Sequence, residues 1–162
     1  MFSPNEVIDI AVRMERNGET VYRQAAARVP DPEVVEMLEW MAGEEARHAR
    51  WFADLKSGLE GGTRLPFTEK FNRVFLNDML DGQSFSLKTV DFAAVDTVGQ
   101  LAELFIEFEH DTILFYEMLC AFAAPETQRQ LAAIIEEEKR HVAQLERTVG
   151  HSASLTAVGG PA

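Results

Sequence analysis

The residues EEARH at positions 44–48 decide the fold, because they recur almost unchanged as EEKRH at positions 137–141. Each copy contains a Glu and a His three residues apart, a spacing that puts both side chains on one face of a helix. One such motif is weak evidence, since Glu and His at this spacing commonly pair on a solvated helix surface. Two copies in one chain indicate a repeated structural unit.

Two further stretches repeat in the same order. ME at 14–15 and FE at 108–109 are each followed by a Tyr seven residues after the Glu. The second of these Glu residues lies 94 residues after the first, and the Glu of the second Glu-x-x-His motif lies 93 residues after its counterpart. This agreement to one residue predicts two halves of the same design.

Four long stretches have the apolar periodicity of helices, at about 3–29, 31–56, 96–124 and 125–149. Gly and Pro fall largely at their ends, and few β-branched runs suggest strands. The fold class is therefore predicted as all-α. Short turns make the first two helices one antiparallel hairpin and the last two another.

A long connection joins the predicted hairpins. Residues 57–97 contain several Gly residues and a Pro around one short amphipathic piece, 69–80, and are expected to form a crossover that contains a short helix. Two short-loop hairpins joined by one long crossover are the connectivity of the ferritin-like four-helix bundle. Residues 1–149 are therefore predicted to form the bundle, and 150–162 a flexible C-terminal tail.

Helix geometry predicts that the repeated polar residues meet. A helix rises about 1.5 Å per residue, so distances counted from the turn at Asp31 put Glu15 and Glu45 within about 3 Å of one level. The same count from Pro125 puts Glu109 and Glu138 within about 5 Å of one level. Packing the two hairpins together then gathers four carboxylates and two imidazoles in the core.

Such a cluster needs positive charge. Desolvation and mutual repulsion would raise the pKa values of four buried carboxylates, and divalent metal supplies the missing counter-charge. Oxygen ligands with imidazole suit iron or manganese, and the absence of thiolates argues against a structural zinc site. One Glu from each of two helices and a Glu-x-x-His from each of the other two is the pattern of ferritin-like di-iron proteins.

On these motifs the sequence resembles the rubrerythrin and ferritin-like di-iron family over roughly residues 5–148. The resemblance implies a site of two iron ions, with manganese as an alternative, and reaction with peroxide or dioxygen. It also implies that Glu45 and Glu138 bridge the ions and that the full ligand set is Glu15, Glu45, His48, Glu109, Glu138 and His141.

The sequence departs from the usual rubrerythrin pattern at two points. Rubrerythrins usually carry a further Glu three residues after the ligand of the third helix, where this chain has Thr112. Glu19, one turn from Glu15, is a candidate substitute carboxylate. The chain also lacks the two cysteine pairs of a rubredoxin domain, since its one cysteine is Cys120. Electrons are therefore expected from a separate donor such as a rubredoxin.

Composition narrows the partners and the compartment. The formal net charge is −12, which argues against nucleic acid and anionic membrane surfaces. No apolar run approaches the roughly 20 residues of a membrane-spanning helix, and residues 1–9 lack the basic, then apolar pattern of a signal peptide. A single cysteine suits a reducing compartment. We expect a cytoplasmic protein, and family resemblance suggests a homodimer.

Three functions remain open from the sequence. The first is a di-iron oxidoreductase, the second a ferroxidase that hands Fe(III) to a cage or partner, and the third a helical interaction protein with a structural metal. Tyr22 and Tyr116 are read equally as hydrogen-bond donors to the ligand carboxylates and as core residues. Trp40 and Trp51 are assigned to packing, and Glu44, Glu136 and Glu137 to a solvated flank.

Overall fold

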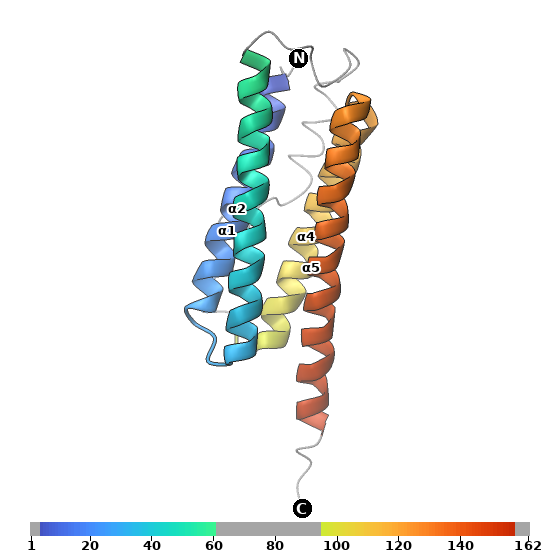
Figure 1. The fold of residues 1–162 in the computed structure, drawn as a ribbon. Coiled ribbons are helices and arrows are strands. Elements are labelled where there is room, and N and C mark those ends of the chain that lie inside the picture. The colour runs from blue at the N-terminus through green and yellow to red at the C-terminus, as the bar shows by residue number, and fades with distance from the viewer. Residues whose placement is uncertain (1–3, 61–94, 158–162) are drawn as a thin grey trace, which may run out of the picture.

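The chain folds into four long helices that lie side by side as two hairpins (Figure 1). The structure is a computed structural model that describes residues 4–60 and 95–157. The helices are α1 (Pro4–Ala26), α2 (Pro32–Glu60), α4 (Val98–Phe122) and α5 (Pro125–Ala157). The predicted all-α, four-helix class is confirmed.

The turn between α1 and α2 is closed by local hydrogen bonds. After α1, the amides of Arg28 and Val29 both donate to the carbonyl of Ala25, at 2.9 and 3.1 Å. Pro30 has no backbone N–H and cannot continue this pattern of hydrogen bonds. The Asp31 carboxylate then accepts a 2.9 Å hydrogen bond from the amide of Glu33, which caps the start of α2.

The start of α4 is also capped. The Thr97 hydroxyl accepts from the Gln100 amide at 3.1 Å, and the Gln100 side chain accepts from the Thr97 amide at 3.2 Å. This reciprocal pair is a capping box, and it fixes the point at which the long connection becomes helix.

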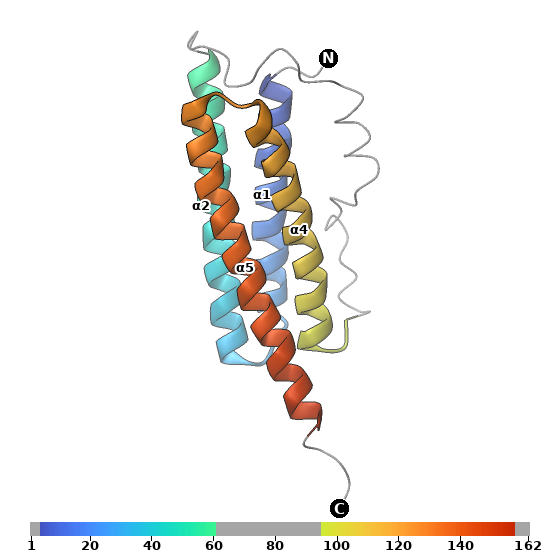
Figure 2. The ribbon, with the colours of Figure 1, turned by 90° about the vertical axis from the view of Figure 1, so that its right-hand side faces the viewer.

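The helix directions distinguish this bundle from a simple up-and-down one. In Figure 1, α2 and α4 run the same way, so the end of α2 and the start of α4 lie at opposite ends of the bundle. Figure 2 shows the same arrangement from the side. This is the ferritin-like topology predicted from the long crossover. The predicted short helix at 69–80 lies outside the described residues.

The core consists of two apolar clusters with a polar layer between them. One cluster gathers the buried apolar residues between Ile8 and Met14 of α1 with Phe52, Tyr116 and Leu131. The other gathers those between Val21 and Ala26 with Leu38, Phe105 and Leu145. In each helix, the repeated Glu and His residues fall between the two clusters in sequence. The polar layer therefore lies across the middle of the bundle, where apolar packing above and below excludes water.

Three helix ends differ from the predicted ones by three residues or more. α1 ends at Ala26 instead of Val29, because a tighter turn follows it. α2 continues past Lys56 to Glu60, and the Lys56 ammonium pairs with Asp9 of α1 at 2.7 Å. α5 continues past Val149 to Ala157, so the predicted tail from residue 150 is wrong at its start. A single Gly150 costs only about 1 kcal/mol in a helix, and no Pro follows before Pro161.

None of the helices within residues 4–60 and 95–157 is long and apolar enough to span a membrane.

Candidate metal centre

The six repeated polar residues meet in the middle of the bundle. α1 and α4 contribute one Glu each, and α2 and α5 contribute a Glu and a His each. Every one of them is at most 2% exposed. They form two groups whose ligand atoms lie within 4.8 Å of one another, namely Glu15, Glu45, His48 and Glu138, and Glu45, Glu109, Glu138 and His141.

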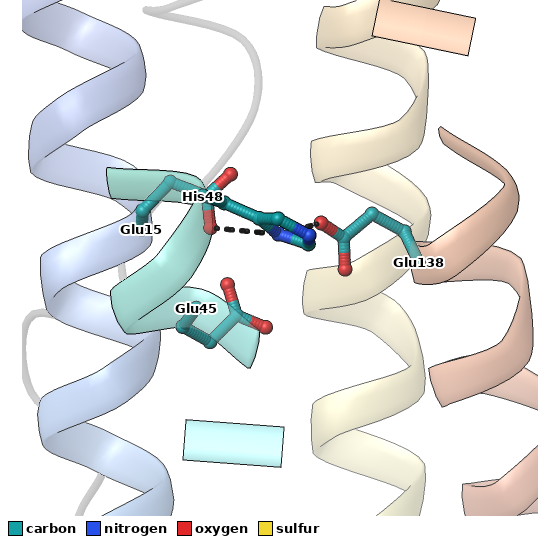
Figure 3. A group of neighbouring side chains, drawn as sticks. All are labelled: Glu15, Glu45, His48 and Glu138. Carbon is teal, nitrogen blue, oxygen red and sulfur yellow. Dashed lines mark ion pairs between the residues drawn. The ribbon is translucent and has the colours of Figure 1, made fainter. Parts of the chain in front are cut away.

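Two carboxylates belong to both groups. Glu45 and Glu138 face each other across the bundle from α2 and α5, and the close-up of the first group shows them on either side of one space (Figure 3). Shared carboxylates are what a site for two neighbouring ions needs. Glu45 and Glu138, the two residues to which the family resemblance assigns a bridging role, are thus the two that both groups share.

Both imidazoles turn the same nitrogen toward the carboxylates. Nδ1 of His48 lies 2.8 Å from Glu138 and 3.6 Å from Glu15. Nδ1 of His141 lies 2.9 Å from Glu138, 3.3 Å from Glu109 and 3.4 Å from Glu45. The Glu138 carboxylate thus lies between the two rings, with one oxygen near each.

Two tyrosines reach across from one hairpin to the other. The Tyr22 hydroxyl of α1 donates to Glu109 of α4, and the Tyr116 hydroxyl of α4 donates to Glu15 of α1. Both rings are fully buried, so each tyrosine fills the core and also orients a candidate ligand. Each tyrosine therefore has both of the roles that the sequence leaves open, as a core residue and as a hydrogen-bond donor to a ligand carboxylate.

The outer nitrogens of the two imidazoles have different surroundings. Nε2 of His48 lies 2.6 Å from Glu137, which Arg47 also contacts at 2.6 Å. Nε2 of His141 is buried and has no hydrogen-bond partner among the described residues. Beside it, the Trp40 ring meets the His141 ring edge-on, with centroids 5.3 Å apart.

Burial favours the protonated form of two of the carboxylates, Glu45 and Glu109. Desolvation, followed by repulsion from Glu138 and Glu15, raises the pKa of Glu45 well above its ordinary value. Desolvation and the charge of Glu138 raise the pKa of Glu109 to about 7, although His141 and Tyr22 oppose this. The tyrosine hydroxyls also have raised pKa values, chiefly from desolvation, and so they remain donors.

The histidines and Glu138 shift in the opposite sense from what burial alone would do. Burial lowers the pKa of His48, but contact with Glu138 and Glu15 raises it more, to about 12. The same competition, with Glu109 and Glu138 as partners, puts the pKa of His141 at about 10. Burial raises the pKa of Glu138, but the two imidazoles lower it more, to about 2. Without metal, the centre is therefore a proton-rich network.

Many polar atoms of this network lack a geometrically satisfactory hydrogen bond. They include Nδ1 of both imidazoles and oxygens of all four carboxylates. Buried polar atoms are nearly always hydrogen-bonded, because an unmet group costs about 1–3 kcal/mol. Their close ion-pair contacts show that the atoms converge without pairing well. A donor set of carboxylate oxygens and imidazole nitrogens that converge in this way fits divalent iron or manganese.

The remaining predicted site residues lie near the centre but outside both groups. Thr112 is 1% exposed, one turn from Glu109, and its hydroxyl has no hydrogen-bond partner among the described residues. The Glu19 side chain is 30% exposed and pairs with Arg23 at 3.1 Å. Glu19 is thus held on the flank of the bundle.

Two nearby residues differ from their predicted roles. Glu137 was assigned to a solvated flank, but its contact with His48 makes it part of the centre's surroundings. The first Glu of the repeated EEARH and EEKRH motifs is a sequence signal for this role of Glu137, although the matching Glu44 pairs with Arg47 instead. Trp40 was assigned to packing, yet it is 43% exposed while it contacts His141.

Comparisons with known proteins give one structure with a similar fold and one family match. No curated protein matches the chain significantly. A crystal structure of a proposed ferritin-like diiron-carboxylate protein from Thermotoga maritima is similar, with a TM-score of 0.67 at 20% identity. The match covers 93% of this chain and 97% of that one, and at this identity it shows the shared fold. The sequence matches the model of the Rubrerythrin family over residues 6–149. The chain therefore belongs to the rubrerythrin family.

Proposed function

We propose that this protein is a rubrerythrin-like di-iron oxidoreductase that binds two iron ions in the bundle core and reacts with peroxide or dioxygen. One observation carries the proposal: two overlapping groups of buried Glu and His side chains converge without satisfying one another's hydrogen bonds. An apolar core retains such groups only where something else satisfies them.

The ligand roles follow from the two groups. Glu15 and His48 would serve one ion, Glu109 and His141 the other, and Glu45 and Glu138 both. Bound iron supplies the Fe(II)/Fe(III) couple, so two ions together provide the two electrons that convert hydrogen peroxide and two protons into two water molecules. Manganese remains an alternative for the same donor set.

The protein's own contribution is to hold the ligands and exclude water. Tyr22 and Tyr116 fix Glu109 and Glu15 by hydrogen bonds across the two hairpins. Because their pKa values are raised, both hydroxyls stay protonated and keep donating. The apolar clusters on either side of the polar layer limit solvent access.

The partners follow from the same proposal. The chain has one cysteine and hence no rubredoxin-type iron site, so we propose an external one-electron donor such as a separate rubredoxin. We also propose a cytoplasmic homodimer that binds neither nucleic acid nor membrane. Light scattering of the purified chain tests the dimer, and a monomer mass would refute it.

The test is a single-turnover reaction. The protein is loaded anaerobically with Fe(II), desalted, and mixed with one equivalent of hydrogen peroxide per chain in a stopped-flow spectrometer. We expect both ions to be oxidised, with two Fe(III) formed per peroxide consumed. Glu138→Ala should lose this reaction, whereas Glu136→Ala should keep it, because Glu136 is exposed and pairs with Lys139.

The other functions give different results when the experiment is repeated with excess Fe(II) in solution. Oxidation of excess Fe(II) well beyond two ions per chain, with release of Fe(III), would favour a ferroxidase. Retained metal with no oxidation by peroxide or dioxygen would indicate a structural site. Either result would refute the proposed oxidoreductase.

A further inference from the structure

We infer that the two metal positions are unequal: the position beside His48 holds its ion tightly, and the position beside His141 holds the ion that exchanges. This inference rests on the proposed binding of two ions, and it concerns which position keeps its ion. It follows from what surrounds each imidazole on the side that faces away from the carboxylates.

A carboxylate supports His48. With Nδ1 facing the ligand cluster, Nε2 carries the proton that is donated to Glu137 at 2.6 Å. Arg47 contacts the same Glu137 oxygen at 2.6 Å, and Arg140 contacts its other oxygen at 3.5 Å. A carboxylate behind a ligating histidine fixes the tautomer and ring orientation and raises the basicity of the ligating nitrogen. Glu137 is thus held in place to strengthen His48 as a ligand.

His141 has no such support among the described residues. Its Nε2 is buried without a hydrogen-bond partner, and the neighbouring Trp40 ring is nearly perpendicular to it, at 86°. An indole offers an aromatic face or edge, a much weaker partner for an N–H than a carboxylate. The ring orientation of His141 is set by packing, without a carboxylate to raise its basicity.

The sequence repeat identifies the carboxylate that would be expected behind His141. Glu44 corresponds to Glu137, and so it is the residue that symmetry would place behind His141. Arg47 binds Glu44 with both terminal nitrogens, one of them at 2.7 Å, on its own helix. The same guanidinium also contacts Glu137 across the bundle. Arg47 therefore holds both acidic side chains on the His48 side.

The side of the His141 ring that faces Trp40 also offers a route for exchange. Trp40 is 43% exposed and lines a surface cleft between α2 and α5, together with Asp31, Glu33 and Glu36. The lining has one basic side chain, Arg147, against these three acidic ones, and its net negative charge would favour the approach of a cation. On this side, Trp40 links the solvent-exposed cleft to the His141 ring.

The test is a calorimetric titration of the metal-free protein with Co²⁺, an air-stable substitute for Fe(II). We expect two binding steps per chain whose Kd values differ by about 10- to 100-fold, the usual effect of such a supporting carboxylate. Glu137→Gln should weaken the tighter step by about the same factor and leave two nearly equal steps. Glu136→Gln removes the same charge from the adjacent, exposed position and should leave both steps unchanged.

Tryptophan fluorescence assigns the steps. The chain has two tryptophans, so Trp51→Phe leaves Trp40 as the sole reporter beside His141. The larger part of Co²⁺ quenching should accompany the weaker step. Quenching that is complete after the first equivalent would overturn the assignment of the tight position to His48.

The outcomes separate this inference from the proposed function. Two equal steps in the wild-type chain, or a Glu137→Gln variant that matches Glu136→Gln, would refute the inequality and leave two-ion binding intact. No binding of Co²⁺ or Fe(II) would instead refute the proposed function. Far-UV circular dichroism checks that each variant keeps its helices, and the 25% exposure of the Glu137 side chain makes loss of the fold unexpected.

Discussion

Loading metal into the centre at pH 7 should release between three and four protons per chain. In the metal-free protein, His48 and His141 have pKa values of about 12 and about 10, so both imidazoles are protonated at pH 7. Glu45 also carries a proton, because burial raises its pKa well above the ordinary value. Glu109, with a pKa of about 7, carries about half a proton. Metal binding requires deprotonated ligands and therefore displaces all of these.

The proton count can be measured by calorimetry. Titration with Co²⁺ at pH 7 in buffers of different ionisation enthalpy gives the released protons as the slope of the observed enthalpy against that ionisation enthalpy. Because protons compete with metal, the affinity should also rise steeply as the pH rises from 6 to 8. Glu136→Gln should give the wild-type slope, since this exposed side chain lies outside the network. A release below one proton per chain would show that the network is not protonated, and would refute the electrostatic account.

Three further predictions concern stability and ligand identity. Metal-free protein should melt at a lower temperature at pH 9 than at pH 6. Four groups, Glu45, Glu109, His48 and His141, bind protons more tightly in the folded than in the unfolded chain, so stability falls as rising pH removes these protons. Thermal melts followed by circular dichroism test this, and a higher melting temperature at pH 9 would contradict it. Glu45→Ala and His141→Ala should each lose metal without unfolding, because removing a buried ligand also removes part of a charged network; elemental analysis beside a circular dichroism spectrum checks both, and a variant with full metal content would exclude that residue from the ligand set. Gly18→Ala should be less stable than Gly43→Ala by about 1–3 kcal/mol. A Cβ at Gly18 would lie 3.2 Å from the Phe108 ring and 3.4 Å from Glu45, whereas nothing lies within 4 Å of a Cβ at Gly43. Equal denaturant midpoints for the two variants would show that the Phe108 ring moves aside freely.

The sequence predicts the bundle well because its signals are periodic. Buried apolar residues recur at helical spacing in all four helices, and the candidate ligands interrupt that pattern at the same depth in each hairpin. The number of residues from the turn is therefore enough to predict that Glu15 and Glu45 lie at the same height in the bundle. Local chemistry, such as Asp31 and Thr97 at helix starts, also fixed several boundaries.

The features that the sequence did not predict depend on tertiary geometry. Glu44 and Glu137 are equivalent in the repeat and both contact Arg47, but of the two it is Glu137 that contacts a ligand histidine, His48. The position of Trp40, 43% exposed yet in contact with the His141 ring of α5, likewise depends on how the two helices pack. The sequence pattern puts the end of the last helix too early, because Gly150 resembles a helix stop although α5 continues through it.

The proposed function requires that the chain bind two metal ions through these six side chains. The most direct test is the iron content per chain, measured by elemental analysis after anaerobic loading with Fe(II) and desalting. We expect about two ions per chain, one for each group of converging ligands. A content near zero would contradict it, and would leave a bundle that has the family's fold without its metal.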